Sequence, residues 1–305
     1  MNKIDGVHNV FMLRPKNFGY NYGTKSTNPF QNEVNFDSNY IAKKATLEFD
    51  DMVQTLEDHK INIHTFEDDA VLEHPDAVYL NNWLAVMPQK ELYLFPMEAE
   101  SRRRERRHDI VEVIKNKIEI VKTVDLSHHE QAGAFLESTG SVVFDYKDRI
   151  AYAAISARTN EQLFNDFCHE IGYEGFVFTG RDFSGTPIYH TNILLSIASK
   201  YAILCADAIE NLLEKALVVK RIEKTGKEII KISMNQMLSF AGNCLEVYDR
   251  NGNSKLVMSR TGFSSLKAEQ IATIEKYSEI VIVNVSIIER IGGGSARCMM
   301  LGIPC

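Results

Sequence analysis

The 305-residue chain has few cysteines, and their arrangement argues against two kinds of site. The five are odd in number, contain no Cys-x-x-Cys pair and stand at Cys168, Cys205, Cys244, Cys298 and Cys305. Such a set fits neither a disulfide framework nor a zinc site. The adjacent His128 and His129 cannot face one metal ion from a regular element. We therefore expect no metal, and a reducing cytoplasm as the compartment.

Long apolar runs are also missing. No stretch is long enough to cross a bilayer, and the first six residues hold no apolar core of a secretion signal. The composition, 45% hydrophobic and 25% charged, is ordinary for a soluble globular protein. These absences predict a cytoplasmic protein without a membrane partner.

Positive charge is scarce. The formal net charge is −7, and the one strongly basic run, 102–107, is interrupted by Glu105. It falls in a helix-like segment from about 97 to 117 that also carries Glu98 and Glu100. We interpret the run as a solvated helix face. A nucleic-acid site would need basic patches elsewhere, so no nucleic-acid partner is expected.

Nucleotide-binding motifs and linkers are absent as well. Neither GxGxxG nor GxxxxGK[ST] occurs, which counts against a doubly wound nucleotide-binding fold. Instead, strand, turn, strand, helix and strand recur roughly every 60 residues, which indicates a closed array of similar units. The clearest unit has strands at 141–146, 150–155 and 175–179 and a helix at 161–171. Further strands are expected at 7–14, 61–66, 77–87, 91–95, 118–124, 188–197 and 201–207, with helices at 36–57 and 208–217.

Glycine, by contrast, is concentrated near the carboxyl end. Gly292, Gly293 and Gly294 precede Ser-Ala-Arg-Cys298, after an apolar run at 279–287 that predicts a buried strand. A loop with so little side-chain bulk could present a thiol to a planar carbon. The plainer interpretation is a turn followed by an inert buried cysteine. The loop alone leaves both open.

Four segments together resemble one superfamily. Residues 292–300, GGGSARCMM, resemble the end of arginine deiminases, where a glycine run precedes the nucleophilic cysteine. Residues 189–192, YHTN, in an apolar strand, resemble the motif with the catalytic histidine. Residues 137–141, ESTGS, resemble the turn with the acidic residue. Residues 156–159, SART, resemble an SxRT motif whose arginine meets the substrate α-carboxylate.

In their order and spacing these segments are similar to the guanidine-modifying (pentein) superfamily of arginine deiminases, dimethylargininases and amidinotransferases. The resemblance implies an α/β fold, a five-bladed propeller of pseudo-symmetric ββαβ units, in a single catalytic domain over 1–305. Residues 12–19 and 76–83 resemble one branch, the citrulline-utilisation hydrolases, which is related to the arginine deiminases and amidinotransferases.

The resemblance implies a catalytic trio. Cys298 would attack the central carbon of a ureido or guanidino group and form a covalent thio-intermediate. His190 would protonate the departing amine and then take a proton from the attacking water. Glu137 would bind a substrate nitrogen and orient His190. Taken alone, His190 would be interpreted as a buried core histidine and Glu137 as an acidic residue next to a turn. Cys305 is the rival thiol, but a terminal residue is poorly held.

Departures from the pattern bear on the substrate. Where arginine-directed members have carboxylates, this chain has Asn82 and Asn192. A carboxamide both donates and accepts hydrogen bonds, as a neutral ureido group requires, whereas a buried guanidinium would lose its counter-charges. Asp76, counted with the substrate-binding residues, or Asp145 could still supply a charge. Arg158 would bind an α-carboxylate, although a surface arginine is the plainer interpretation.

These residues predict a cysteine-dependent hydrolase of a C–N bond, with citrulline converted to ornithine, carbon dioxide and ammonia, and no cofactor. The partner would be a small ureido or guanidino amino acid, and a homo-oligomer stays open. An arginine deiminase, a dimethylargininase-like hydrolase and an amidinotransferase are alternatives of the same fold. A catalytically inactive binding module is the alternative from another class.

Overall fold

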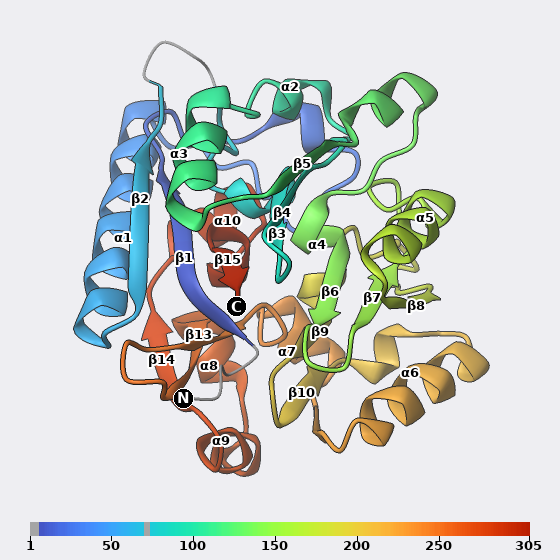
Figure 1. Ribbon diagram of the computed structural model, residues 1–305. Helices are drawn as coiled ribbons and strands as arrows, with labels where there is room; N and C mark the ends of the chain where they lie inside the picture. Colours follow the sequence, from blue (N-terminus) through green and yellow to red (C-terminus); the bar gives the residue numbers. More distant parts are fainter. Residues whose placement is uncertain (1–5, 70–73) are drawn as a thin grey trace.

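The computed structural model describes residues 6–69 and 74–305, and over these residues the strands form five three-stranded sheets. Residues 1–5, on which the expected absence of a secretion signal rests in part, lie outside this range. Figure 1 shows the sheets arranged around a common centre, with the C-terminus near that centre. The fold is the predicted α/β five-bladed propeller. None of the helices described could cross a membrane, because none combines enough length with enough apolar character.

Each blade has one innermost strand that pairs antiparallel with a middle strand, which pairs parallel with an outer strand across a helical connection. One blade consists of β3 (Leu84–Met87), β4 (Glu91–Leu94), α2 (Glu100–Arg103), α3 (His108–Ile118) and β5 (Lys122–Asp125). The next consists of α4 (Ser138–Ser141), β6 (Val142–Asp145), β7 (Ile150–Ala154), α5 (Glu161–Ile171) and β8 (Glu174–Phe178). A third blade consists of β9 (Leu195–Ile197), β10 (Tyr201–Leu204), α6 (Leu212–Lys224) and β11 (Glu228–Lys231). A fourth consists of α7 (Met234–Leu238), β12 (Leu245–Tyr248), β13 (Ser254–Ser259), α8 (Arg260–Ser265), α9 (Ala268–Glu275) and β14 (Glu279–Val283).

The remaining blade joins the two ends of the chain. It contains β1 (Val7–Arg14), α1 (Ser38–Asp58), β2 (Asn62–Glu67) and, after α10 (Ser286–Gly292), the last strand β15 (Leu301–Pro304). β15 pairs antiparallel with β1, with Phe11 opposite Leu301. The strand that follows the glycine-rich loop is therefore hydrogen-bonded to the first strand of the chain, which fixes the position of Cys298.

Helical periodicity explains why one connection, the helix α5, was predicted well. In α5 the buried residues Leu163, Phe164, Phe167 and Ile171 recur at helical spacing, and the Asn160 side chain accepts the N–H of Leu163 at the start. The predicted bounds 161–171 are confirmed. The strand predicted at 7–14 is also confirmed, because its largely buried run forms the middle strand of a sheet.

Besides the run 77–87, which is a strand only over Leu84–Met87, two predictions of strands near the site were wrong in part. The run 279–287 forms a strand only as far as Val283, and α10 then begins at Ser286. The Glu48 carboxylate of α1 accepts the N–H groups of Ile287 and Ile288 and the hydroxyl of Ser286. A carboxylate at a helix start stabilises its free N–H groups, so a distant residue favours a helix here.

The second error concerns residues 189–192. They form the turn before β9 rather than a strand, with η4 at Thr191–Ile193 and the N–H of Leu194 donating to the carbonyl of Thr191. The apolar run 188–197 reflects burial in the centre of the molecule, not the period of a strand.

Candidate active site

One end of the propeller axis gathers polar residues from five loops. Each of these loops leads into the innermost strand of a different blade. The residues are Asn82 before β3, Glu137 before β6, His190 and Asn192 before β9, Asn243 before β12, and Cys298 before β15. Because the blades repeat around a centre, equivalent positions converge at the same end (Figure 1).

A narrow cavity lies among these loops. The predicted residues Cys298, His190, Asn82, Asp76 and Arg158 all line it. The other two predicted residues lie beside it: Glu137 contacts His190, and Asn192 lies next to the thiol. Every one of the seven is at most 3% exposed. The structure thus brings together residues that are up to 222 positions apart, from Asp76 to Cys298.

His190 and Glu137 form a buried pair. Glu137 Oε2 lies 2.8 Å from Nε2 of His190, and its other oxygen accepts the N–H of Glu98. Gly140 makes room for this arrangement, since a Cβ there would come within 2.8 Å of both the His190 ring and the Asn82 amide. Glu137 thus holds one ring nitrogen, which leaves the other to exchange a proton in the cavity.

Burial and charge determine the ionisation of this pair. Burial lowers the pKa of His190 to about 4 against the opposing effect of Glu137. Burial alone would raise the pKa of Glu137, but Arg158, His190 and Arg102 lower it to about 2. Near neutral pH the site therefore holds a neutral imidazole beside an ionised carboxylate. A neutral imidazole is the form that can take a proton.

The thiol of Cys298 is surrounded by carboxamides. Asn243 Nδ2 lies 3.4 Å from Sγ, and Asn192 Oδ1 lies 3.8 Å from it. Asn243 also donates to Asn192 and accepts the backbone N–H of Arg297. Asn192 in turn donates to the carbonyl of Thr139, so both its polar atoms are used beneath the thiol. Asn192 was predicted to contact substrate; here it contacts the nucleophile.

Asn243 was missed by the sequence analysis, although it had a signal. It stands just before the innermost strand β12, as Asn82, His190 and Cys298 stand before theirs. Once a five-fold repeat is inferred, a polar residue at this position in the fifth unit is the natural candidate. Its side chain is completely buried.

The three glycines make room for protein side chains. A Cβ on Gly292 or Gly294 would collide with the ring of Tyr79, and one on Gly293 with Asn28. Gly293, at φ +67°, also ends α10 in the left-handed region. Tyr79 and Tyr189 line the cavity, and the Tyr189 hydroxyl donates to the carbonyl of Gly293 at 2.5 Å. The loop is therefore packed rather than flexible.

Two arginines reach the cavity, one of them unexpected. Arg158 donates to the hydroxyl of Thr27 at 2.9 Å and lies 3.4 Å from Glu137, with its guanidinium over the Tyr189 ring. Arg102, from the basic run, is only 1% exposed and donates from Nη1 to Asn82 Oδ1 at 2.8 Å. Both guanidinium groups line the same cavity.

The interpretation of the basic run as a solvated helix face was therefore wrong for Arg102. The segment forms two helices, α2 and α3, with a break between them. In that break Glu105, 1% exposed, binds the Arg102 guanidinium with both oxygens, at 2.8 and 3.0 Å. A buried charge needs such a partner, and the spacing of Glu105 after Arg102 was the overlooked signal.

Asp76 and Asp145, the two carboxylates that could supply a counter-charge to the substrate, have different positions. Asp76 lines the cavity, accepts from Asn21 at 2.8 Å and lies 3.7 Å from Arg102. Its Oδ1 is buried without a hydrogen bond in the structure. Asp145 lies away from this cavity and pairs with Lys227. The rival thiol Cys305 follows β15, where its N–H donates to the carbonyl of Gly6. In the described part of the chain no group of three or more histidine, cysteine or acidic side chains could hold a metal ion.

Comparison with known families agrees with this geometry. Residues 14–304 match the family model of eukaryotic N,N-dimethylarginine dimethylhydrolases. The chain belongs to this family. The dimethylhydrolase family and the solved structures that resemble the chain are all guanidino-modifying penteins, as the motifs indicated. No curated protein matches the chain in a sequence search.

Solved structures share the fold of this dimethylhydrolase-family chain at low sequence identity. ArgZ, an arginine dihydrolase from the ornithine–ammonia cycle in cyanobacteria, superposes with a TM-score of 0.74 at 14% identity. The match covers 97% of this chain but only 40% of ArgZ. The isolated N-terminal domain of ArgZ, a cysteine-to-serine variant bound to substrate, gives 0.72 at 15% identity, with 97% of both chains covered. A dimethylarginine dimethylaminohydrolase bound as an adduct with S-methyl-L-thiocitrulline gives 0.66 at 18%, covering 97% of this chain and all of the other.

The pH dependence of thiol reactivity should follow the burial of Cys298 in this dimethylhydrolase-family protein. Burial raises the thiol's pKa above its usual value, despite lowering contributions from Ser295, Asn243 and Arg297. Since only the thiolate reacts, alkylation by uncharged iodoacetamide should accelerate roughly tenfold per pH unit below the midpoint. We expect that midpoint above the usual pKa of a cysteine thiol, measured by mass spectrometry at Cys298. A plateau already reached at pH 7 would contradict the prediction.

Proposed function

We propose that this protein is a cysteine-dependent hydrolase that cleaves the ureido group of citrulline to give ornithine, carbon dioxide and ammonia. The observation that supports a hydrolase of this type is the shared cavity of Cys298, His190 and Arg158, with Glu137 behind the histidine. A nucleophile, a proton carrier and a cation for a carboxylate are what hydrolysis of an α-amino-acid side chain requires.

The proposed reaction uses each group in turn. Sγ of Cys298 bonds to the ureido carbon while its proton passes to His190. Collapse of this adduct breaks a C–N bond, and His190 gives the proton to the departing amine. Water then attacks the thioester-like carbon, with His190 as the base, and the thiol is released. The remaining carbamate loses carbon dioxide, so one water is consumed for each ornithine and ammonia formed.

The α-carboxylate would bind between Arg102 and Arg158. Their guanidinium groups line one cavity and each lies over a tyrosine ring, Tyr79 and Tyr189 respectively. Planar guanidinium groups match the two oxygens of a carboxylate. Tertiary contacts hold both arginines before substrate arrives, which reduces the ordering cost of binding.

The preference for a ureido group is supported by what surrounds the thiol. Asn192 and Asn243 contact Sγ, and Asn82 lines the cavity next to His190. The nearby carboxylates Glu137 and Glu105 already pair with arginines and the histidine. A cationic guanidinium would lack a free counter-charge there, whereas a neutral ureido group can both donate to and accept from carboxamides.

A guanidino substrate is the second candidate, and one observation favours it. Oδ1 of Asp76 lines the cavity without a hydrogen bond and could accept from a guanidinium. The family match to dimethylarginine hydrolases and the arginine dihydrolase neighbours point the same way. Burial, however, raises the pKa of Asp76 against the effect of Arg102, which weakens it as a counter-charge.

The deciding experiment supplies the purified protein with citrulline, arginine and N,N-dimethylarginine separately and quantifies ornithine, citrulline and ammonia. We expect equal amounts of ornithine and ammonia from citrulline, and little product from either cation. Arginine giving citrulline and one ammonia would indicate a deiminase. Arginine giving ornithine and two ammonia would indicate a dihydrolase. Strong turnover of a cation with none of citrulline overturns the proposal.

Asn82→Asp should lower kcat/KM for citrulline by roughly 10²-fold and shift relative preference toward arginine. The carboxamide now donates to Asn81 at 3.2 Å and accepts from Arg102, whereas a carboxylate could only accept. Asn82→Ala is the matched control: it removes the amide without adding charge, so it should weaken citrulline turnover without favouring arginine. An unchanged ratio of the two substrates in Asn82→Asp would contradict this reading of Asn82.

A further inference from the structure

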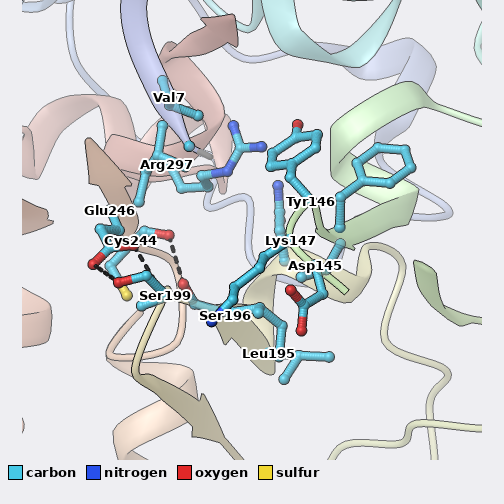
Figure 2. A pocket seen from close by; sticks show the side chains of 17 residues that line it. Val7, Asp145, Tyr146, Lys147, Leu195, Ser196, Ser199, Cys244, Glu246 and Arg297 are labelled. Carbon is cyan, nitrogen blue, oxygen red and sulfur yellow. Dashed lines mark hydrogen bonds between the residues drawn. The ribbon is translucent and has the colours of Figure 1, made fainter. Parts of the chain in front are cut away.

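A second, larger pocket lies at the opposite end of the propeller axis. The catalytic residues precede the innermost strands, whereas Asp145, Tyr146 and Lys147 lie at the end of β6 and Ser199 lies just beyond the end of β9. Because the innermost strands are arranged around a common centre, their two ends open on opposite sides. The volume of the second pocket is about 60 Å³, which leaves room for a small ligand only. Figure 2 shows its labelled side chains.

Arg297, the residue before the nucleophile, is directed into this pocket and not into the catalytic cavity. In Figure 2 its guanidinium points toward the ring of Tyr146. It donates to the carbonyl of Met300 at 2.8 Å, and no carboxylate of the described residues pairs with it. Arg102 and Arg158, the buried arginines at the other end, both have carboxylate partners. Burial lowers the pKa of Arg297, as expected for a cation without a counter-charge.

The other charges of the pocket leave a place for an anion. Asp145 is neutralised by Lys227. Glu246 accepts from the N–H and hydroxyl of Ser199 at 2.7 and 2.9 Å, so its oxygens are engaged. Lys147 is exposed, forms no ion pair with the residues that the structure describes, and extends across the front of the pocket in Figure 2. Two cations therefore face the space, and the carboxylates that line it have other partners.

We propose that this pocket binds a small carboxylic acid through Arg297 and Lys147, and that the bound anion slows the chemistry at Cys298. The planar guanidinium of Arg297 suits the two oxygens of a carboxylate. Val7 and Leu195 offer apolar contact to the remainder of the ligand (Figure 2). This inference concerns a site apart from the catalytic cavity and does not depend on which substrate the enzyme cleaves.

Arg297 is connected to the Cys298 thiol through a single carboxamide, that of Asn243. The backbone N–H of Arg297 donates to Asn243 Oδ1 at 3.1 Å, and Nδ2 of the same carboxamide lies 3.4 Å from Sγ of Cys298. The positive charge of Arg297 also favours the thiolate. A carboxylate paired with that charge would reduce this effect, so the direction of regulation is inhibition.

The site is tested by calorimetric titration of the full chain with succinate, and with inorganic phosphate as a second probe. We expect saturable succinate binding that weakens at least tenfold in Arg297→Gln and several-fold in Lys147→Gln. Lys43→Gln, on α1, removes the same charge away from the pocket and should bind as the unmodified protein does. If Arg297→Gln does not fold, Lys147→Gln still tests the site, because Lys147 is exposed. Phosphate binding more tightly than succinate, with the same dependence on both cations, would replace carboxylate by phosphate as the ligand class.

A further variant distinguishes binding in this pocket from binding in the catalytic cavity at the other end of the axis. Arg158→Gln removes a cation from the catalytic cavity and should leave succinate binding intact. Loss of binding in Arg158→Gln, or full binding in both Arg297→Gln and Lys147→Gln, overturns the site. Saturating succinate should slow iodoacetamide alkylation of Cys298 several-fold in the unmodified protein and not in Arg297→Gln. An unchanged rate overturns the inhibitory effect. Neither readout needs turnover, so failure of the proposed citrulline reaction leaves them separately interpretable.

Discussion

Replacing Cys298 by serine is expected to lower turnover by at least roughly 10⁴-fold while leaving the fold intact. The thiol is the group in the cavity able to form a covalent intermediate with a planar carbon, and a hydroxyl in the same place is a far weaker nucleophile. Serine is close to cysteine in volume and can keep the contacts with Asn243 and Asn192. Initial rates with citrulline measure the loss, and thermal unfolding checks the fold.

Cys305→Ser is the matched control for this variant. Cys305 is half-buried, follows β15 and lies beyond the last strand, away from the loops that precede the innermost strands. Its replacement should leave the rate within about twofold, since surface changes distant from a site usually have small effects. Activity retained in Cys298→Ser, or lost in Cys305→Ser, would remove Cys298 from the proposed role.

Replacing His190 by glutamine should lower steady-state turnover by about 10³-fold or more. Glutamine can keep a hydrogen bond to Glu137 but cannot carry a proton between thiol, departing amine and water. Since burial lowers the pKa of His190 to about 4, the imidazole stays neutral through the neutral range and becomes cationic only in acid. The unmodified enzyme should therefore lose activity as the pH falls toward 4.

The glutamine variant also separates two steps. If His190 acts mainly on the second half of the reaction, an adduct on Cys298 should accumulate and be visible by mass spectrometry of quenched samples. His169→Gln, exposed in the last turn of α5, removes a histidine elsewhere and should leave the rate unchanged. Retention of more than a tenth of the rate in His190→Gln would contradict a proton-transfer role.

Much of the fold could be predicted from local pattern. The strand at 7–14 could be predicted because it is a short, largely buried apolar run, and the helix at 161–171 because its buried residues recur at helical spacing. Prediction failed where a distant partner determines the local structure. Residues 286–292 form a helix whose first N–H groups are accepted by Glu48, more than 230 positions earlier.

The sequence by itself determined the chemistry available: a thiol after a glycine run, a histidine, an acidic residue and an SxRT arginine, in an order that resembles the pentein superfamily. Only the tertiary structure decided which further residues join them. The spacing of Glu105 after Arg102 is compatible with an ion pair, but only the structure shows that the pair is buried and that Arg102 lines the cavity. The role of Asn243 became visible only in the fold, where the blade of β12 places its carboxamide against the thiol. Likewise, only the fold shows that the Arg297 backbone contacts Asn243 while its side chain lines the opposite pocket. The physical reason is that burial and pairing of polar groups depend on contacts between blades, which no local period records.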